Sequence, residues 1–329
     1  MASRDRKASL ITVLLALATN ALIATAKLVV GAVSGSSAML AEGAHSVADT
    51  VNELFLLTSL RRSTRPPDST HPFGYGAERF FWSLLAAIGI FLSGAVFSMY
   101  QAITAFTEPG GGSHSYTWSY VVLGVAFVAE GTSWVRSVVQ LQGESSAAGR
   151  TFLDHLRRSR DPTVKTVFSE DAAALLGIGI AATAIGLHQA TGDRVWDALG
   201  AATIAVLLTV VAFYLGRHNM ALLTGQSADP ELRQQLWVEL MAVPEVDAVV
   251  ELLTMHIGAD EILLATRLDL ADGLTSDEIE DVSSQIERQI SERHPEVTQV
   301  FLDATRASRP QRERAHRLAA MHGETKSST

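Results

Sequence analysis

The stretch from Met39 to Glu53, MLAEGAHSVADTVNE, places polar side chains inside a run that is otherwise apolar enough to cross a membrane. Steps of three and four residues bring side chains onto one helix face. That face carries Glu42, His45, Asp49 and either Asn52 or Glu53. An ionised group near a bilayer centre costs about 2.5 to 3.5 kcal/mol on insertion scales. Because His and Asp one turn apart offer nitrogen and oxygen ligands, the stretch predicts a metal site inside a membrane.

Among the other polar side chains that interrupt the apolar half of the chain, we single out Asn20, Lys27, Glu130, Glu170 and Asp171. Lys27 fits a snorkelling side chain or the partner of a carboxylate, and Asn20 fits an interhelical hydrogen bond. Adjacent Glu170 and Asp171 point about 100° apart on a helix, so we expect only one to meet the second helix. Small residues beside Asp171 allow close helix approach, which favours Asp171 as a metal ligand and leaves Glu170 a supporting role.

Six segments are long and apolar enough to cross the hydrocarbon core, which takes about 20 helical residues. They lie near residues 9–33, 37–60, 80–106, 116–141, 164–188 and 194–216. Basic residues cluster in alternate connections: Arg4, Arg6 and Lys7; Arg61, Arg62 and Arg65; Arg150, Arg157, Arg158 and Arg160. The positive-inside rule then predicts that both termini are cytoplasmic. The chain has no cysteine, so a metal here would have nitrogen and oxygen ligands.

The chain after residue 216 changes character and predicts a small soluble domain. Asp229 and Pro230 begin an expected helix, and 246–258, 261–270 and 297–304 alternate as strands. Between the last two strands, a Thr/Ser cap and an acidic first turn open an amphipathic helix. We therefore divide the chain into a cytoplasmic N-terminus (1–8), a six-helix transmembrane domain (9–216), a cytoplasmic α+β domain (217–305) and a basic tail (306–329), for which disorder is expected.

Three sequences together resemble the cation diffusion facilitators, a family that exports Zn²⁺ and related divalent ions in exchange for protons. They are AEGAHSVADTVNE, HPFGYGAER (His71 to Arg79) and SEDAAALLG. The resemblance covers about residues 9–305 and implies six membrane helices, a ferredoxin-like cytoplasmic domain and a homodimer. DPTVKTVFSEDAAALLG further resembles the branch that contains the mitochondrial zinc transporter related to nuclear-receptor coactivators.

The resemblance also implies a metal site, from which this chain departs. The common family pattern is Asp-x3-Asp on the second helix and His-x3-Asp on the fifth. Here His45 and Asp49 occupy the first pair and Asp171 matches the second, but Val167 cannot bind metal. Because a tetrahedral metal site has four ligands, we expect Glu130 to be the fourth, with Glu170, Glu42 or water as alternatives. Members of the family often bind metal in the cytoplasmic domain as well. In this chain His256 and His294 lie in the corresponding regions, but Arg267 and Thr305 occupy positions where further ligands could be.

The predicted function is a proton-coupled exporter of a divalent cation, with Zn²⁺ favoured by the imidazole of His45. Histidine titrates near neutral pH and binds metal only when neutral, so protons and metal would compete at His45 during alternating access. Mn²⁺, Fe²⁺ or Co²⁺ transport, a passive channel, and a membrane-anchored sensor or interaction protein are the alternatives. No enzyme, organic cofactor or nucleic-acid partner is expected. The bilayer of a bacterial plasma membrane is the expected location.

Overall fold

The structure is a computed structural model, and it describes residues 2–107, 116–147, 149, 151–153 and 162–307. The basic residues predicted at Arg150, Arg157, Arg158 and Arg160, and nearly all of the predicted tail, lie outside this part. The chain divides into two compact units. The membrane unit comprises Met1–Thr64 and Glu78–Met220, and the C-terminal unit comprises Arg65–Ala77 and Ala221–Thr329.

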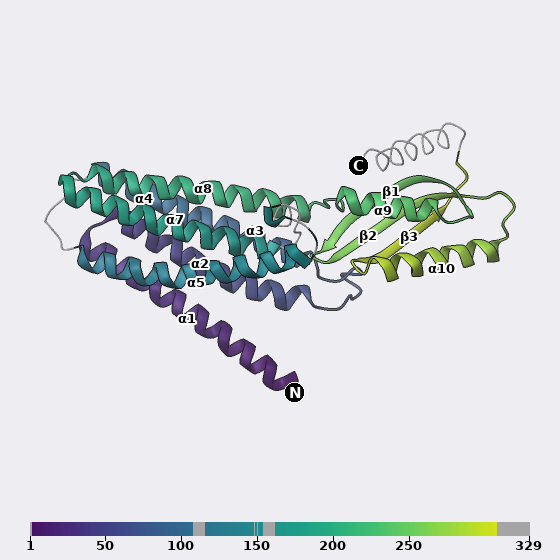
Figure 1. Ribbon diagram of the computed structural model, residues 1–329, viewed down its shortest axis with the longest axis horizontal. Coiled ribbons are helices and arrows are strands. Elements are labelled where there is room, and N and C mark those ends of the chain that lie inside the picture. The colour runs from purple at the N-terminus through teal and green to yellow at the C-terminus, as the bar shows by residue number, and fades with distance from the viewer. Residues whose placement is uncertain (1, 108–115, 148, 150, 154–161, 308–329) are drawn as a thin grey trace. The chain divides into compact units, whose positions relative to one another are not determined.

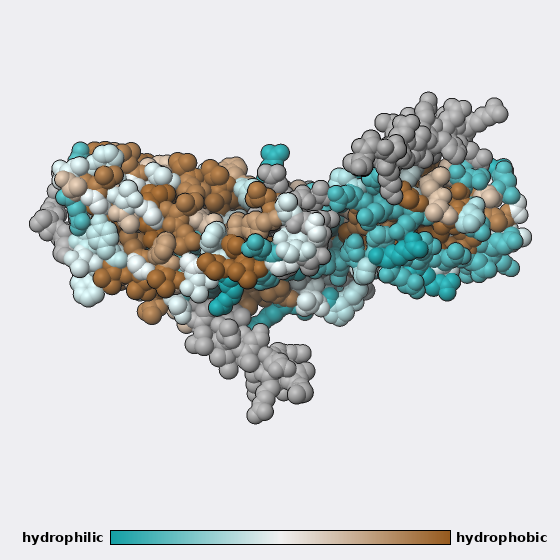
Figure 2. Space-filling view, viewed as in Figure 1, coloured by the Kyte–Doolittle hydropathy of each residue, from teal (hydrophilic) through white to brown (hydrophobic). Residues whose placement is uncertain are grey.

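Long helices build the membrane unit (Figure 1). They are α1 (Ala2–Ser34), α2 (Ser37–Ser63), α3 (Glu78–Gly89), a π-helical stretch (Ile90–Val96), α4 (Phe97–Thr107), α5 (Thr117–Ala147), α7 (Pro162–Thr191) and α8 (Val195–Leu223). Within the described residues, five spans are long and apolar enough to cross a membrane; they lie in α1, in α3 to α4, in α5, in α7 and in α8. Apolar side chains cover much of the visible surface of these helices (Figure 2).

The remaining predicted span, near residues 37–60, is α2, which is 27 residues long and contacts α1, α3, α4 and α7. Its acidic side chains make it too polar to be counted with the five apolar spans. Much of the face that it turns to its neighbours consists of small buried residues, among them Ala38, Ala41 and Ala48. A Cβ atom at Gly43 would lie 2.7 Å from Leu28 of α1, so α1 and α2 approach closely. The helical membrane protein predicted from the sequence is confirmed.

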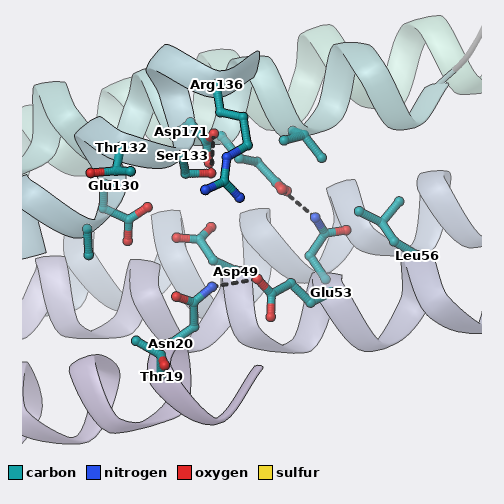
Figure 3. A pocket seen from close by; sticks show the side chains of 14 residues that line it. Thr19, Asn20, Asp49, Glu53, Leu56, Glu130, Thr132, Ser133, Arg136 and Asp171 are labelled. Carbon is teal, nitrogen blue, oxygen red and sulfur yellow. Dashed lines mark hydrogen bonds between the residues drawn. The ribbon is translucent and has the colours of Figure 1, made fainter. Parts of the chain in front are cut away.

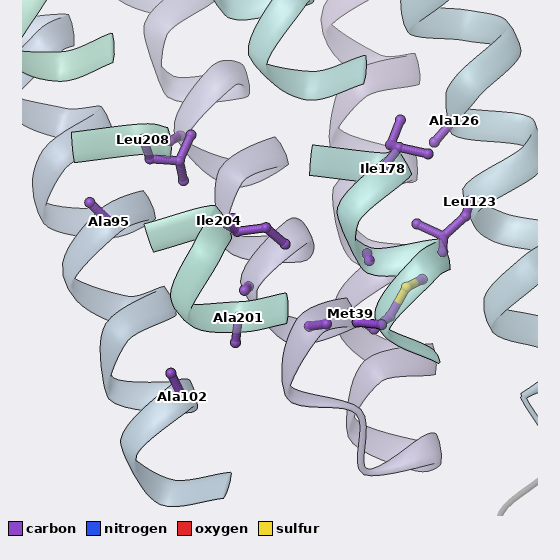
Figure 4. Packing of buried hydrophobic residues seen from close by; sticks show 14 of the residues in the cluster. Met39, Ala95, Ala102, Leu123, Ala126, Ile178, Ala201, Ile204 and Leu208 are labelled. Atoms are coloured by element: carbon purple, nitrogen blue, oxygen red, sulfur yellow. The ribbon is translucent and has the colours of Figure 1, made fainter. Parts of the chain in front are cut away.

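Small and branched apolar residues fill the core between these helices. Met39 of α2, Leu123 and Ala126 of α5, and Ile178 of α7 belong to one buried cluster (Figure 4). At the other end of the cluster, α8 contributes Ala201, Ile204 and Leu208 (Figure 4). Because this core is apolar, the polar side chains of α2 need partners of their own elsewhere in the unit.

The start of α2 is held by an aspartate of α8. Ser36 caps the helix by accepting a hydrogen bond of 3.2 Å from the backbone N–H of Met39. The carboxylate of Asp197 accepts a hydrogen bond of 2.6 Å from the Ser36 hydroxyl and another from the N–H of Ser37. A negative charge at a helix N-terminus is stabilising, and here it also fixes the register of α2 against α8.

The C-terminal unit is a three-stranded sheet with two helices on one face. Its elements are α9 (Pro230–Met241), β1 (Val246–Gly258), β2 (Glu261–Leu270), α10 (Ser276–Arg293) and β3 (Val297–Ala304). The strand order is β1-β2-β3, antiparallel and then parallel. Buried Leu236 of α9, Leu264 of β2 and Ile286 of α10 share one core. Thr275 and Glu278 form a capping box at the start of α10, where a Thr/Ser cap was predicted, and all three predicted strands are confirmed.

The connection Arg65–Ala77, between α2 and α3, folds as part of the C-terminal unit. Phe73 lies edge-to-face against Phe301 of β3, with ring centroids 6.1 Å apart. A Cβ atom at Gly76 would lie only 2.7 Å from the carbonyl oxygen of Ile257, so this close approach requires glycine. The segment that contains HPFGYG is therefore a docked loop whose two ends continue into α2 and α3.

Candidate functional site

A polar pocket of about 310 Å³ lies among α1, α2, α5 and α7 (Figure 3). Its walls are formed by Thr19, Asn20, Asp49, Asn52, Glu53, Leu56, Ala129, Glu130, Thr132, Ser133, Arg136, Val167, Glu170 and Asp171. On α2 and on α5 these residues recur at steps of three and four, so each helix presents one continuous face to the pocket. That volume is enough for several water molecules, at about 30 Å³ each.

Three of the four predicted metal ligands line this pocket together. Asp49 enters from α2, Glu130 from α5 and Asp171 from α7. Their convergence depends on helix packing, because 81 residues separate Asp49 from Glu130 and 41 separate Glu130 from Asp171. The pocket is therefore an acidic site assembled from distant parts of the chain.

The fourth predicted ligand, His45, lies one turn before Asp49 on α2 and does not line the pocket in the described part of the chain. Its Nδ1 atom is 3.4 Å from Oδ1 of Asp49. His45 is buried, and neither ring nitrogen has a hydrogen-bond partner among the described residues. Both nitrogens are therefore available, and a small movement of the ring or of Asp49 would bring imidazole and carboxylate to one ion.

No three His, Asp or Glu side chains of the described residues are already gathered closely enough to hold a metal ion. The four predicted ligands are neighbours in an arrangement that would have to contract around a cation. Val167, at the position where the family pattern has histidine, forms an apolar part of the pocket wall. The identity of the fourth ligand therefore stays a prediction.

The structure differs from the expectation that Asp171, and not Glu170, would meet the second helix. Glu170 accepts a hydrogen bond from the side chain of Asn52 on α2. Asp171 instead accepts a hydrogen bond of 2.9 Å from the hydroxyl of Ser133 on α5. The two adjacent side chains point apart as expected, but the pocket lies between α2 and α5, so both carboxylates line it.

Glu42, one of the alternatives for the fourth ligand, is engaged elsewhere. Its Oε1 atom lies 3.0 Å from Nζ of Lys27, and both side chains are fully buried. The same ammonium donates a hydrogen bond of 2.7 Å to the hydroxyl of Ser46. A Cβ atom at Gly177 of α7 would overlap Oε2 of Glu42, so the pair fits only because glycine is there. Of the two roles considered for Lys27, the structure shows pairing with a carboxylate.

Several pocket residues were underrated or missed by the sequence reasoning. Asn20 makes the predicted interhelical hydrogen bond, and its acceptor is Oε1 of Glu53. Glu53 and Asn52, named as alternatives on the polar face of α2, both line the pocket. Arg136 was overlooked, although it follows Ser133 by three residues on α5. The spacing of Glu130, Ser133 and Arg136 was the signal that could have found them.

Two of the residues singled out in the C-terminal unit, His294 and Arg267, have partners within that unit. Nε2 of His294 lies 3.2 Å from Oε1 of Glu239. Nε of Arg267 donates a hydrogen bond of 2.8 Å to Asp303, which is exposed on the sheet. No metal-binding group is present among the described residues of this unit either.

Comparison with known proteins places these features in a family context. The family model for the cation efflux transmembrane domain matches residues 13–224. The proton-coupled zinc antiporter SLC30A9, mitochondrial, of Mus musculus is 33% identical over 257 residues, covering 78% of this chain and 45% of that protein. Metal tolerance protein C4 of Arabidopsis thaliana is 31% identical, with 77% and 55% covered. The chain thus spans about half the length of these two relatives.

A shorter bacterial protein matches over nearly its whole length. The manganese efflux system protein MneP of Bacillus subtilis is 27% identical over 305 residues, covering 92% of this chain and 97% of MneP. The relatives named here thus include one described by zinc and one described by manganese.

Proposed function

The chain belongs to the cation diffusion facilitator family of membrane transporters, and on that premise we propose that it exports Zn²⁺ in exchange for protons. Membership makes it a transporter of divalent metal cations and not an enzyme. The observation that carries the proposal is the pocket of about 310 Å³ within the helix bundle, which five carboxylates from three helices line. Such a concentration of acids at membrane depth favours a cation as the transported species.

We assign the transported ion to His45, Asp49, Asp171 and Glu130. Asp49, Glu130 and Asp171 already line the pocket, and His45 lies 3.4 Å from Asp49 with both ring nitrogens free of hydrogen bonds in the described structure. Imidazole nitrogen favours Zn²⁺ over Mg²⁺ and Ca²⁺. Mn²⁺ is the second candidate, because a relative covering most of the chain is named for manganese efflux. Glu170, which accepts a hydrogen bond from Asn52, is the alternative to Glu130 as the fourth ligand.

Proton coupling follows from the chemistry of these ligands. A carboxylate or imidazole binds a metal ion only in its deprotonated form, so metal and protons exclude one another at the same atoms. If the pocket opens alternately to the two sides of the membrane, each cycle exchanges one ion for protons. Supporting this, the pocket side chains come from four helices, so a change in helix packing would alter both access and ligand geometry.

We further propose that both termini are cytoplasmic, that the protein lies in a bacterial plasma membrane, and that the C-terminal unit joins two copies. Alternating basic connections support the orientation. The sheet face away from α9 and α10 supports the dimer, because it leaves Leu253 56% and Phe301 49% exposed. The loop at Phe73 shields part of that face within one chain.

The deciding experiment is flux of Zn²⁺, Mn²⁺, Co²⁺ and Fe²⁺ into proteoliposomes across an imposed pH gradient. We expect gradient-driven Zn²⁺ flux in the wild type, loss of flux in Asp49→Asn and unchanged flux in Asp247→Asn, an exposed carboxylate of β1. Flux that ignores the pH gradient would identify a passive channel. Full metal resistance of cells that carry Asp49→Asn would instead favour a sensor or interaction protein.

A further inference from the structure

An open apolar groove of about 470 Å³ lies between α3 and α8 of the membrane unit and shares no lining residue with the polar pocket. Its volume falls within the range of about 300 to 1,000 Å³ that small-molecule sites occupy in proteins. Of the side chains that line it, those of Ala87 and Ala212 are buried, whereas those of Ile88, Phe213 and Met220 are exposed. The groove therefore combines small buried residues with large apolar side chains that face away from the helix bundle.

Arg217 of α8 is the one charged residue among the described residues that line this groove. Between Asp197 and Arg217, the sequence of α8 carries no charge. A helix rises 1.5 Å per residue, so these two charges are separated by about 30 Å along the axis, which is the thickness of the hydrocarbon core. Arg217 therefore lies at the boundary between the hydrocarbon core and the lipid head groups, where a long basic side chain is favourable.

The guanidinium of Arg217 is available to a ligand. The residue is exposed, and it forms no ion pair with another described residue. Its planar fork can bind a phosphate group through two parallel hydrogen bonds. None of the described residues that line the groove is acidic, so the ammonium of a zwitterionic head group would find no carboxylate there. This charge pattern favours a head group with a net negative charge.

We propose that the groove binds one anionic phospholipid, with its phosphate group at Arg217 and part of an acyl chain between α3 and α8. The inference does not depend on which ion the protein transports. Phe213 precedes Arg217 by one turn on the side of the hydrocarbon core, and its ring lies edge-to-face against that of Phe91 with centroids 6.0 Å apart. The acyl chain would pack on this aromatic pair, and basic pockets between membrane helices are suited to anionic lipids.

The test measures lipid binding to the full chain in detergent by native mass spectrometry, comparing phosphatidylglycerol with phosphatidylethanolamine of the same acyl chains. We expect the wild type to bind phosphatidylglycerol about fivefold more tightly, as one basic residue near a membrane surface provides. Arg217→Gln should lose this preference and should bind phosphatidylethanolamine as the wild type does. Arg61→Gln, which removes an exposed arginine in the last turn of α2, is the matched control and should keep the preference.

A second variant tests the groove itself. A Cβ atom at Gly216 would lie 3.9 Å from side-chain atoms of Leu84 and Ala87, an ordinary contact distance, so a larger side chain can enter the groove. Gly216→Leu should weaken binding of both lipids by about tenfold, which corresponds to the loss of roughly two buried methylene groups. Gly124→Leu on α5 is the control, because its Cβ atom would have no neighbour within 4 Å in the described structure.

Three outcomes would overturn the inference. They are equal affinity of the wild type for the two lipids, an unchanged preference in Arg217→Gln, and unchanged binding of both lipids in Gly216→Leu. If Gly216→Leu instead altered the ratio of monomers to dimers and left lipid binding unchanged, the groove would be a contact between two copies of the chain and not a lipid site.

Discussion

Helix α2 carries two polar regions two turns apart, and they differ in charge balance. Around Glu42, one carboxylate meets one ammonium, that of Lys27, and both side chains are fully buried 3.0 Å apart. Around Asp49, five carboxylates and one guanidinium surround an open volume of about 310 Å³. Both regions combine carboxylates with a basic side chain, yet one is closed and balanced while the other is open and has an excess of acid.

The difference separates a structural role from a transport role on one helix. The Lys27–Glu42 pair has a balancing charge and no room, so a metal ion would have to break an ion pair in a dry environment. The pocket at Asp49 has space and uncompensated negative charge, and both favour a cation. Polar residues within a membrane are often treated as one functional class. Here, partner count and accessible volume decide which of them can bind an ion.

The largest expected effect comes from breaking the balanced pair. Glu42→Gln leaves the ammonium of Lys27 buried without its counter-charge, and such a change costs about 3 to 5 kcal/mol of stability. The double variant Lys27→Met with Glu42→Gln removes both charges and should recover most of that loss. Denaturant unfolding of the purified protein in detergent measures both. A loss below about 1 kcal/mol in the single variant would show that water reaches the pair, and the two regions would not then be distinct.

The reverse pattern is expected in the open pocket. Asp171→Asn removes a carboxylate from an acidic cluster, so stability should hold while Zn²⁺ flux falls by about 100-fold or more. Ser133→Ala keeps that carboxylate but removes one of its hydrogen-bond donors, and flux should fall by about tenfold, as for outer partners of a metal ligand. Proteoliposome flux with parallel unfolding measurements separates the two quantities. If Asp171→Asn destabilised the protein as strongly as Glu42→Gln, the pocket would be structural too.

The positions of the helices and strands could be predicted from the sequence, but not which polar side chains contact one another. The ranges 246–258, 261–270 and 297–304 were predicted correctly, because alternation and turn residues are local signals. Asp49, Glu130 and Asp171, singled out as costly polar groups, line one pocket, and their role as ligands stays a prediction.

The pairing itself depends on helix packing, which spacing does not encode. The contact between Lys27 and Glu42 requires the close approach of α1 and α2, and the choice of Glu170 for Asn52 depends on the rotation of α7. Arg136 shows the same limit, because its distance in sequence from Asp49 hides their common pocket. Docking of Arg65–Ala77 in the C-terminal unit is equally a tertiary fact, because the sequence marked this segment only as a basic connection and as part of a family motif.

A smaller effect is expected from enlarging one glycine behind the balanced pair. Gly177→Ala would place a methyl group against Oε2 of Glu42, and crowding of this kind costs about 1 to 3 kcal/mol. Gly179→Ala, two residues along α7, is the control, because its Cβ atom would have no neighbour within 4 Å in the described structure. Thermal unfolding in detergent compares the two. Equal stability of both variants would mean that the Lys27–Glu42 pair is not tightly enclosed.

The smallest effect on stability is expected at Asp68, which lies outside both the Lys27–Glu42 pair and the pocket at Asp49. This carboxylate is exposed in the docked loop, where water can solvate its charge. The hydroxyls of Thr70 and Tyr75 and the N–H of His71 donate to it, and these hydrogen bonds hold its pKa well below its usual range. A lowered pKa in the folded state means that the stabilisation is present above about pH 4 and is lost as pH falls further. The protection factors of the amides in residues 65–77, which correct exchange rates for their intrinsic pH dependence, should therefore fall in acid for the wild type. In Asp68→Asn the protection factors should be low already at neutral pH and should change little with acid. Equal protection of the amides in the two proteins at neutral pH would contradict this prediction, because it would show that the three hydrogen bonds to Asp68 do not stabilise the loop.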